Sequence, residues 1–347
     1  FQDHVFQFKD GEYVMSHVTQ KQLYVRVLRL ESDDGNIGWG EITRKSVLDP
    51  ATVGAKEARL LAGLVGNDVA ELPAFVRRLL GGDSALRGLA FGLETAYLDW
   101  VARRAGIPLY ALLGGRLVEE VRDYFSLPCV SPRQVATVLA TQAKGWEVVQ
   151  VKLGVDDRQT DGERIQAALS TLDTHQSILA DFNGALSVDS AISLLANFDD
   201  PRIVWEEPCR SIEQNTQVAQ RTGRAIMFDQ CLGSLDDISR VASAGVAHSV
   251  WLKPPLLGGL GVARAALDIC IDAKMPMRID GPWCAHIASS ACLHLAVGVP
   301  DELLIAGCDL RQPLLLTEDW GGTQHLANHR IAPTSVAGHG AVPMSAC

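Results

Sequence analysis

Six ionisable side chains close successive apolar runs along this sequence, at intervals of 29, 25, 23, 24 and 27 residues: Lys152, Asp181, Glu206, Asp229, Lys253 and Asp280. Each interval has room for one strand and one helix. In a barrel of parallel strands, the residues that end the strands point into one mouth, where such barrels carry out their chemistry. The spacing therefore predicts that these six side chains share one site.

Three of them are carboxylates at consecutive strand ends, namely Asp181, Glu206 and Asp229. Converging carboxylates repel one another unless a cation lies between them, and oxygen ligands suit a hard divalent ion such as Mg²⁺. An aspartate after a strand can instead be only the N-cap of the next helix. That explanation is hard to extend to three consecutive strands, so we predict that the three carboxylates are Mg²⁺ ligands.

Two lysines, Lys152 and Lys253, lie on either side of these carboxylates along the predicted sheet. A single lysine is most often a solvated surface charge, but lysines at an apolar mouth can have lowered pKa values and act as base and acid. A positioned base supplies roughly 10²–10⁴-fold, whereas enzymes commonly reach about 10⁶-fold or more. Stabilisation of an ene-diolate by the metal would supply much of the difference. The set is typical of proton removal next to a carboxylate group.

The elements that must position these residues alternate regularly from about Val121. Short β-type runs alternate with segments such as 165–172, which has apolar residues at i, i+3, i+4 and i+7. Ser131 is a helix-start signal, and Gly245 is expected to end the helix before the sixth strand. This alternation predicts a parallel sheet. Besides the run that ends at Asp229, the predicted strands are 124–127, 147–152, 177–181, 203–206, 249–253, 275–280 and 303–306.

The first part of the chain has a different pattern. A strand at 23–30, a turn at Gly35 and Asn36, a second strand near Trp39 and a helical stretch at 89–104 predict an α+β segment. We therefore expect three parts. They are an N-terminal α+β domain at 1–118, a barrel at 119–312, and a tail at 313–347 that is too short to fold alone and packs back on the N-terminal domain.

Composition excludes several function classes. The 347 residues are 47% hydrophobic and 21% charged, which is enough for a large core. The net charge of −10 and the absence of a Lys/Arg cluster argue against a nucleic-acid partner.

The charge-free run 281–300 contains His and Ser and is not expected to span a membrane. The chain starts without a signal-like segment, so a cytoplasmic location is predicted. The eight cysteines have no CxxC pair and are expected to be free core thiols.

Five segments carry the predicted ligands and lysines: Val151-Lys152-Leu153-Gly154, Asp181-Phe182-Asn183-Gly184, Trp205-Glu206-Glu207-Pro208, Phe228-Asp229-Gln230 and Leu252-Lys253-Pro254. They resemble the enolase superfamily, and specifically its muconate-lactonizing-type subgroup, which has a lysine on each side of a Mg²⁺ site. In the N-terminal part, 38–41, 96–99 and 108–115 look like the family's capping domain. The resemblance implies an α/β fold. This fold is a modified TIM barrel, (β/α)7β, with an α+β capping domain built from the N-terminal segment and the C-terminal tail.

Two later segments, 283–288 and 305–311, look most like cis-3-hydroxy-L-proline dehydratases. By this resemblance Trp283 covers the ring nitrogen of the substrate, since an indole face attracts a cation within about 6 Å. Simple core packing is the alternative role for Trp283. The residues that the resemblance implies as substrate contacts are Asn183, Asp280, Trp283 and Asp309.

The sequence departs from the family at two positions. Gln150 stands where the family has the first lysine of a Lys-x-Lys motif, and Gln230 replaces a frequent Glu after the third ligand. Another group must therefore supply whatever effect this lysine has on the pKa of the base. Neither change removes a predicted ligand or lysine.

The leading hypothesis is Mg²⁺-dependent dehydration of cis-3-hydroxy-L-proline to 1-pyrroline-2-carboxylate. It proceeds by α-proton abstraction, through a metal-stabilised ene-diolate, with loss of the 3-hydroxyl. Lys152 is favoured as base and Lys253 as acid, although the sequence leaves open which lysine faces which side. The alternatives are a racemase or epimerase of proline-like amino acids or betaines with the same two lysines, and a barrel that binds a ligand without catalysis. The expected partner is a small amino-acid substrate, and the family implies a homo-oligomer.

Overall fold

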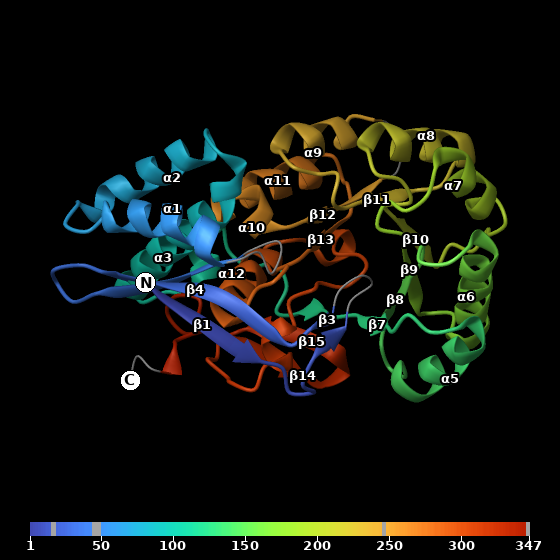
Figure 1. Ribbon diagram of the computed structural model, residues 1–347, viewed down its shortest axis with the longest axis horizontal. Coiled ribbons are helices and arrows are strands. Elements are labelled where there is room, and N and C mark those ends of the chain that lie inside the picture. Colours follow the sequence, from blue (N-terminus) through green and yellow to red (C-terminus); the bar gives the residue numbers. More distant parts are fainter. Residues whose placement is uncertain (15–18, 44–49, 245–247, 345–347) are drawn as a thin grey trace.

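The predicted β/α alternation forms one parallel sheet in the computed structural model, which describes residues 1–14, 19–43, 50–244 and 248–344. Seven strands are hydrogen-bonded in the order β13-β12-β11-β10-β9-β8-β7 (Figure 1). Their bounds are β7 Phe125–Leu127, β8 Val148–Lys152, β9 Ser177–Asp181, β10 Ile203–Glu206, β11 Ile226–Phe228, β12 Ser249–Leu252 and β13 Met277–Ile279. The predicted fold class, a modified barrel with a separate α+β domain, is confirmed.

The last predicted strand, 303–306, is wrong in its bounds. Asp301–Leu303 form the 3-10 helix η3, and the chain then makes only single parallel bridges, from Leu304 to Met277 and from Asp309 to Asp280. Between the two bridges, Ala306 and Gly307 have φ values of 65° and 66°, which are incompatible with extended strand. The segment 304–309 therefore fills the remaining gap in the barrel as an irregular stretch.

Helices follow the barrel strands and cover their outer side. Ser131 starts the first of them, as its helix-start signal predicts, with a capping box to Gln134. Ser234 likewise caps α9 and accepts the Asp237 N–H at 3.2 Å. Gly245, the predicted end of α9, lies outside the described residues. The helices are α5 Pro132–Gln142, α6 Arg158–Thr171, α7 Val188–Leu195, α8 Ile212–Thr222, α9 Leu235–Ala242, α10 Pro254–Leu257, α11 Leu260–Asp272 and α12 His286–Ala296.

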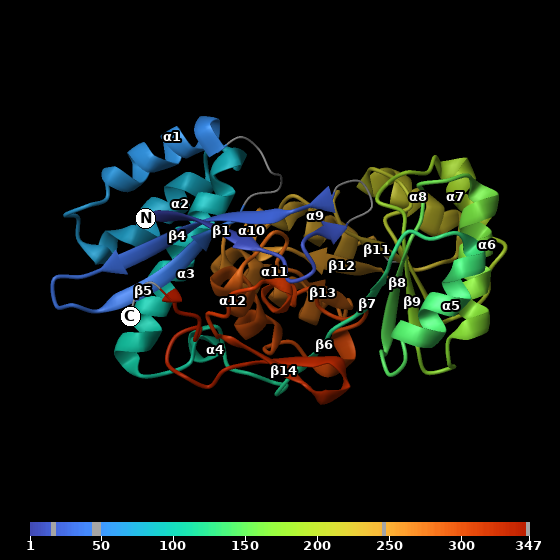
Figure 2. The same cartoon turned by 60° about the horizontal axis from the view of Figure 1, so that its bottom comes forward.

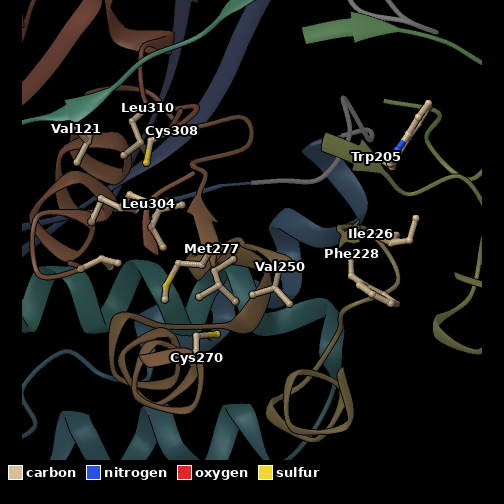
Figure 3. Packing of buried hydrophobic residues seen from close by; sticks show 14 of the residues in the cluster. Val121, Trp205, Ile226, Phe228, Val250, Cys270, Met277, Leu304, Cys308 and Leu310 are labelled. Carbon is tan, nitrogen blue, oxygen red and sulfur yellow. The ribbon is translucent and has the colours of Figure 1, made fainter. Parts of the chain in front are cut away.

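Alternate residues of the barrel strands face the helices and form the main hydrophobic core. Figure 3 shows Phe228, Val250 and Met277 from three neighbouring strands in this cluster. Side chains of a strand point alternately to its two faces, so the residues between these positions face the barrel interior. Trp251 and Arg278 are such interior residues, and both are buried.

The N-terminal domain is an antiparallel sheet that packs on helices. Gly40 is required here, because a Cβ at this position would lie 2.0 Å from the Gly92 carbonyl oxygen of α3. The sheet has the order β1-β4-β5. The elements are β1 Gln2–Gln7, β2 Tyr13–Val14, β3 Thr19–Gln20, β4 Gln22–Glu31, β5 Ile37–Ile42, α1 Pro50–Ala62, η1 Val69–Glu71, α2 Leu72–Leu80, η2 Ser84–Leu86, α3 Arg87–Ala105 and α4 Leu109–Leu112.

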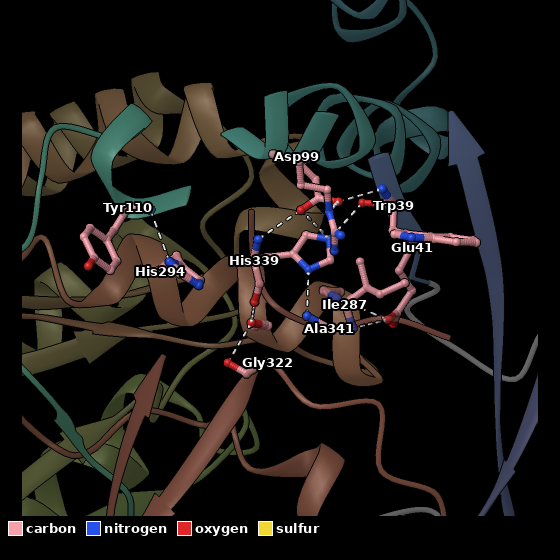
Figure 4. Close-up of polar contacts among 12 residues, drawn as sticks. Trp39, Glu41, Asp99, Tyr110, Ile287, His294, Gly322, His339 and Ala341 are labelled. Carbon is pink, nitrogen blue, oxygen red and sulfur yellow. Dashed lines mark hydrogen bonds and ion pairs between the residues drawn. The ribbon is translucent and has the colours of Figure 1, made fainter. Parts of the chain in front are cut away.

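The end of the chain returns to the N-terminal domain. His339 N–H donates to Asp99 Oδ1 at 3.0 Å, and its ring Nε2 lies 3.0 Å from the Trp39 carbonyl oxygen (Figure 4). Figure 1 and Figure 2 both place the N-terminal sheet and α1 to α3 at one end of the molecule and α5 to α7 at the other end. The remaining elements are β6 Val121–Arg122, η4 Gln312–Leu315, β14 Thr323–Leu326, η5 Ala327–His329 and β15 Arg330–Pro333. The domain limits 1–118, 119–312 and 313–347 stay a prediction.

No helix in the described part of the chain has the length and hydropathy needed to cross a membrane. Most of the charge-free run 281–300 forms α12, whose eleven residues are all buried against the rest of the protein. The described cysteines are all free thiols, five of them buried: Cys209, Cys270, Cys284, Cys292 and Cys308.

Candidate active site

The sheet register brings the first three predicted site residues together. Lys152 on β8 pairs with Asp181 on β9, and Asp181 pairs with Glu206 on β10. Asp229 directly follows β11. Because these are parallel strands in register, their carboxyl ends place the side chains at one edge of the sheet.

The remaining strand ends complete the group. Lys253, which follows β12, forms an ion pair with Asp229, and its Nζ lies 4.0 Å from Asp280 Oδ2. Asp280 follows β13 and forms a parallel bridge with Asp309. The structure therefore brings together all six residues from which the sequence argument started.

A cavity of about 700 Å³ opens at this edge of the barrel. The N-terminal domain contributes Phe8, Gln20 and Leu23 to its wall, so the cavity lies between the two domains. The predicted site residues that line it are Lys152, Asp181, Asn183, Asp229, Lys253, Asp280, Trp283 and Asp309. The volume is in the range of small-molecule sites.

Glu206 is the most unusual carboxylate of the group. It is completely buried, and neither of its oxygens has a hydrogen-bond donor among the described residues. Burial, followed by the neighbouring charges of Asp181 and Asp229, raises the pKa of Glu206 well above its ordinary value. A buried carboxylate is costly without a compensating charge, so a cation at this position would relieve that cost.

Each lysine is paired with a different carboxylate. Lys152 contacts Asp181, and Lys253 contacts Asp229. Burial alone would lower the lysine pKa values, but the nearby carboxylates outweigh it, and the pKa of each lysine lies above its ordinary value. The lowered pKa values expected from the sequence are therefore wrong for this arrangement, because the carboxylates are closer to the amines than any like charge is.

The donor set fits a hard divalent cation. Four strand-end carboxylates face two lysines, so these side chains carry a formal excess of two negative charges. Among the described residues, no group of three or more His, Cys, Asp or Glu side chains is arranged to hold a metal ion. Asp181 and Asp229 are paired with the lysines instead. The all-oxygen chemistry and the unpartnered Glu206 oxygens nevertheless suit Mg²⁺.

Comparison with known proteins finds that two family models match the chain. Residues 134–345 match the family model described as enolase C-terminal domain-like. Residues 5–114 match the model of the mandelate racemase / muconate lactonizing enzyme N-terminal domain.

The chain belongs to the enolase superfamily. The resemblance inferred from the five sequence segments is thus confirmed, and the protein is an enolase-superfamily enzyme. Members of this superfamily generally use Mg²⁺.

Several enolase-superfamily relatives have different activities. A cis-3-hydroxy-L-proline dehydratase from Roseibium aggregatum is 25% identical over 97% of this chain and 93% of its own length. A D-Ala-D/L-Ala epimerase from Cytophaga hutchinsonii is 26% identical, with coverage of 91% of this chain and 87% of its own. A solved enolase-superfamily structure from Roseovarius nubinhibens ISM, complexed with magnesium, has a TM-score of 0.84 and 27% identity. The match covers 98% of this chain and 95% of the chain in that structure.

The two departures from the enolase-superfamily pattern both join a hydrogen-bond network around Asp181. Gln150 donates to Asp181 Oδ2 at 3.0 Å, where the family has a lysine. Asn183 donates to Asp181 Oδ1 through its side chain at 2.7 Å and accepts from Gln230 at 2.8 Å. The predicted substrate contact Asn183 therefore also holds Asp181 in place. Ser126 closes the network by donating to Gln150 at 3.3 Å.

Glu207 is a residue of this enolase-superfamily site that sequence reasoning missed. Its buried carboxylate accepts the backbone N–H groups of Asp229 at 2.7 Å and Cys231 at 2.9 Å, and also that of Gln230. It thereby fixes the loop that carries the third predicted ligand. The available signal was the second acid of the Glu206-Glu207 pair, which the sequence alone does not distinguish from a surface charge.

Glu41 was also missed, although it belongs to the capping-domain segment 38–41. Its carboxylate accepts backbone N–H groups at the start of α12, from Ala285 at 2.6 Å and from Ile287 and Ala288 at 3.1 Å (Figure 4). This contact fixes the segment that follows Trp283. Trp283 itself has φ 60° and lines the cavity, while it also packs on the cluster around Trp39.

Proposed function

We propose that this chain is a Mg²⁺-dependent lyase that removes water from cis-3-hydroxy-L-proline and gives 1-pyrroline-2-carboxylate. One observation carries the proposal: Lys152 and Lys253 line the same cavity, and each is paired with a different carboxylate. Two amines on separate sides of a bound amino acid can act on both of its faces. The dehydratase from Roseibium aggregatum supports the choice of substrate.

The ligands in this proposal are Asp181, Glu206 and Asp229. Asp181 and Asp229 would exchange their lysine contacts for the cation, and the unpartnered oxygens of Glu206 would gain a partner. When bound, Mg²⁺ supplies a positive charge that holds the substrate carboxylate and stabilises the negative charge that develops on it. Loss of the Asp181 contact removes the nearest charge that raises the pKa of Lys152, so this lysine can lose its proton and act as a base. Lys253 keeps Asp280 beside it and stays an ammonium.

The protein residues carry the proton transfers. The Lys152 amine takes the α-proton, and the electron pair of the broken C–H bond forms a double bond between C2 and C3 of the ring. The C3–O bond breaks on the other face, and the Lys253 ammonium protonates the departing hydroxyl, which leaves as water. The enamine product then tautomerises to the cyclic imine. In this substrate the hydroxyl and the α-hydrogen lie on opposite faces, so two opposed lysines suit it.

Four residues are proposed as substrate contacts. Asp280 and Asp309 form an acidic pair beside Lys253, which suits the ring ammonium of a proline. Burial, followed by the charge of Asp309, raises the pKa of Asp280 well above its ordinary value. A cation bound beside this pair would offset the repulsion between the two carboxylates. Trp283 and Asn183 line the same cavity and complete the set.

A racemase or epimerase of proline-like amino acids or betaines is the second candidate. The observation that favours it is that both lysines are embedded in equivalent ion pairs, so either can remove or return a proton. The epimerase from Cytophaga hutchinsonii covers nearly as much of this chain as the dehydratase does. In D₂O, an epimerase labels both stereoisomers of a proline without a 3-hydroxyl, whereas a dehydratase gives a trappable imine from the hydroxylated one.

The decisive experiment is a screen with Mg²⁺ of hydroxyprolines, N-methylated prolines and dipeptides against the native protein, Lys152→Ala and Lys253→Ala. We expect imine formation from cis-3-hydroxy-L-proline in the native protein and its loss in both variants. Full activity in either variant would show that the lysine concerned has no catalytic role. Retained turnover in excess chelator would contradict the Mg²⁺ requirement. A cytoplasmic location and a homo-oligomer belong to the same proposal.

A further inference from the structure

A buried arginine lies between two aromatic rings inside the barrel. Arg278 on β13 is fully buried, and its guanidinium carbon lies 4.0 Å from the ring centroid of Tyr124 and 4.0 Å from that of Trp251. None of its three guanidinium nitrogens has a hydrogen-bond acceptor in the described part of the chain. The faces of the two rings contact this charge, and the carboxylates of Glu206, Asp280 and Asp309 attract it without a hydrogen bond.

The same indole also contacts Lys253. Lys253 Nζ lies 4.2 Å from the ring centroid of Trp251. Trp251 is paired in register with Arg278 across β12 and β13, and it precedes Lys253 by two residues, so the two side chains leave the chain on the same face. We call Tyr124, Arg278, Trp251 and Lys253 the cation–ring column.

Core packing alone does not account for the column. An apolar side chain at position 278 would fill the interior without desolvating a guanidinium. The guanidinium adds a planar charge that is attracted to both ring faces and so holds the Trp251 ring in one orientation. The other close partners of Lys253 are the carboxylates Asp229 and Asp280, which attract its charge but do not support its flexible stem.

We propose that Trp251 is a positioning residue for Lys253, and that Arg278, held by Tyr124, fixes the plane of the indole on which the lysine lies. The inference rests on the proposed function, in which Lys253 is the acid and Asp229 turns to Mg²⁺. Once Asp229 has turned away, Asp280 still attracts the ammonium, and the indole face supplies the surface that keeps it on its side of the cavity. The cation–ring column therefore keeps Lys253 in place during turnover, when its ion pair with Asp229 is lost.

Nuclear magnetic resonance tests the column without any assumption about the substrate. Nuclei held over an indole face are shifted to lower frequency, so the ε-methylene signal of Lys253 in ¹³C-lysine-labelled protein should be shifted, and Lys253→Ala identifies it by its absence. We expect the shift to disappear in Trp251→Leu, to shrink in Arg278→Met, and to persist in Trp251→Phe and Arg278→Lys. A signal at the ordinary lysine position in the native protein, or one unchanged by Trp251→Leu, overturns the proposal.

Kinetics with Mg²⁺ and cis-3-hydroxy-L-proline give the second readout. We expect kcat to fall about tenfold or more in Trp251→Leu and Arg278→Met with KM within about threefold, because placement of the acid affects the transition state more than binding. Trp251→Phe should recover most of the loss. Trp100→Phe, a buried tryptophan of α3 that is hydrogen-bonded to Ser32, is the matched control and should keep the native kcat. Equal losses in Trp251→Leu and Trp251→Phe indicate a merely structural role and overturn the proposal.

The two proposals fail in different ways. Activity in Lys253→Ala contradicts the proposed function, whatever the resonance of Lys253 shows. An inactive Lys253→Ala together with a fully active Trp251→Leu contradicts only the positioning role of Trp251. If cis-3-hydroxy-L-proline is not turned over by the native protein, the proposed substrate is wrong, and the resonance experiment alone decides on the column.

Discussion

At the scale of single residues, the site is defined by carboxylates whose charges are not fully compensated within the protein. Asp181 and Asp229 each have a lysine, whereas Glu206 is buried without a hydrogen-bond partner in the described residues. A buried carboxylate without a partner destabilises the metal-free protein. Binding of a ligand explains why the protein has a glutamate at this position.

This reasoning predicts opposite effects of Glu206→Gln on stability and on metal binding. Removal of the buried charge should leave the melting temperature of the metal-free protein unchanged or raise it. The affinity for Mg²⁺ or Mn²⁺ should fall by at least about tenfold, since loss of even an indirect contact to a metal costs about 10–100-fold. Calorimetric titration and thermal unfolding measure the two effects. Glu163→Gln, an exposed glutamate on α6, is the control. Strong destabilisation with unchanged metal affinity would give Glu206 a structural role.

Sequence reasoning found the residues that end strands, because their spacing repeats. It did not find the roles of Glu207, Trp251 and Arg278, because the contacts that define these roles are made between adjacent strands and not along the chain. It also expected lowered lysine pKa values from desolvation and like-charge neighbours, whereas the structure pairs each lysine with a carboxylate that raises its pKa.

At the scale of elements, close backbone contact joins β5 to α3, and carboxylate caps join the N-terminal domain to the barrel. Glu41 caps α12, and Glu94 of α3 accepts the Gly261 N–H at the start of α11 at 3.2 Å. These helices follow the strands that lead to Asp280 and Lys253. The N-terminal domain therefore holds the starts of both helices as well as forming part of the cavity wall.

Gly40→Ala should destabilise the protein strongly. The added Cβ would lie 2.0 Å from the Gly92 carbonyl oxygen, and this contact is with backbone that cannot move away cheaply. We expect a loss of about 1–3 kcal/mol or more, as for other overpacked sites. Urea unfolding measures it. Gly63→Ala, whose nearest atom would be at 3.5 Å, is the control and should change stability little. A Gly40→Ala protein as stable as the native one would mean that β5 and α3 can separate.

Glu41 should make stability depend on pH. Burial, against the opposing effect of the Ala285 N–H and its neighbours, raises the pKa of Glu41 from 4.5 to about 7. A group whose pKa is raised by folding contributes stability below its unfolded pKa, and that stability is lost as the pH rises through the folded value. Between pH 4.5 and 7, therefore, the metal-free protein should lose part of its unfolding free energy as the pH rises. Glu41→Gln has no charge at any pH in this range, so its unfolding free energy should depend less on pH. An identical slope in the variant would contradict this assignment.

The elements themselves were largely predictable. The periodic apolar pattern gave β8 to β10 with bounds within one residue of those observed, because parallel barrel strands are buried on both sides and read as continuous apolar runs. The last strand was predicted wrongly because Ala306 and Gly307 look apolar but adopt positive φ. A pattern of hydrophobicity does not report backbone conformation.

At the scale of the whole molecule, binding of Mg²⁺ between strands should stabilise the fold. A ligand that binds only the folded state adds about 2.7 kcal/mol at 100 times its Kd. We expect a melting temperature that rises with Mg²⁺ concentration and returns to the metal-free value in excess chelator. Calorimetric scans across a Mg²⁺ series check this, with Glu206→Gln as the variant that should need at least about ten times more Mg²⁺ for the same rise. A melting temperature independent of Mg²⁺ would contradict a metal site in the barrel.

His339 contacts Asp99 and Trp39, which precede it by 240 and 300 residues. During synthesis on the ribosome, the first hundred residues emerge long before this partner exists. Their packing cannot be completed until His339 has been translated, because loop closure over such a span must come late. We conclude that nascent chains stalled before His339 will be sensitive to protease around Trp39 and Asp99, and that release of the segment with His339 will complete the packing of this region.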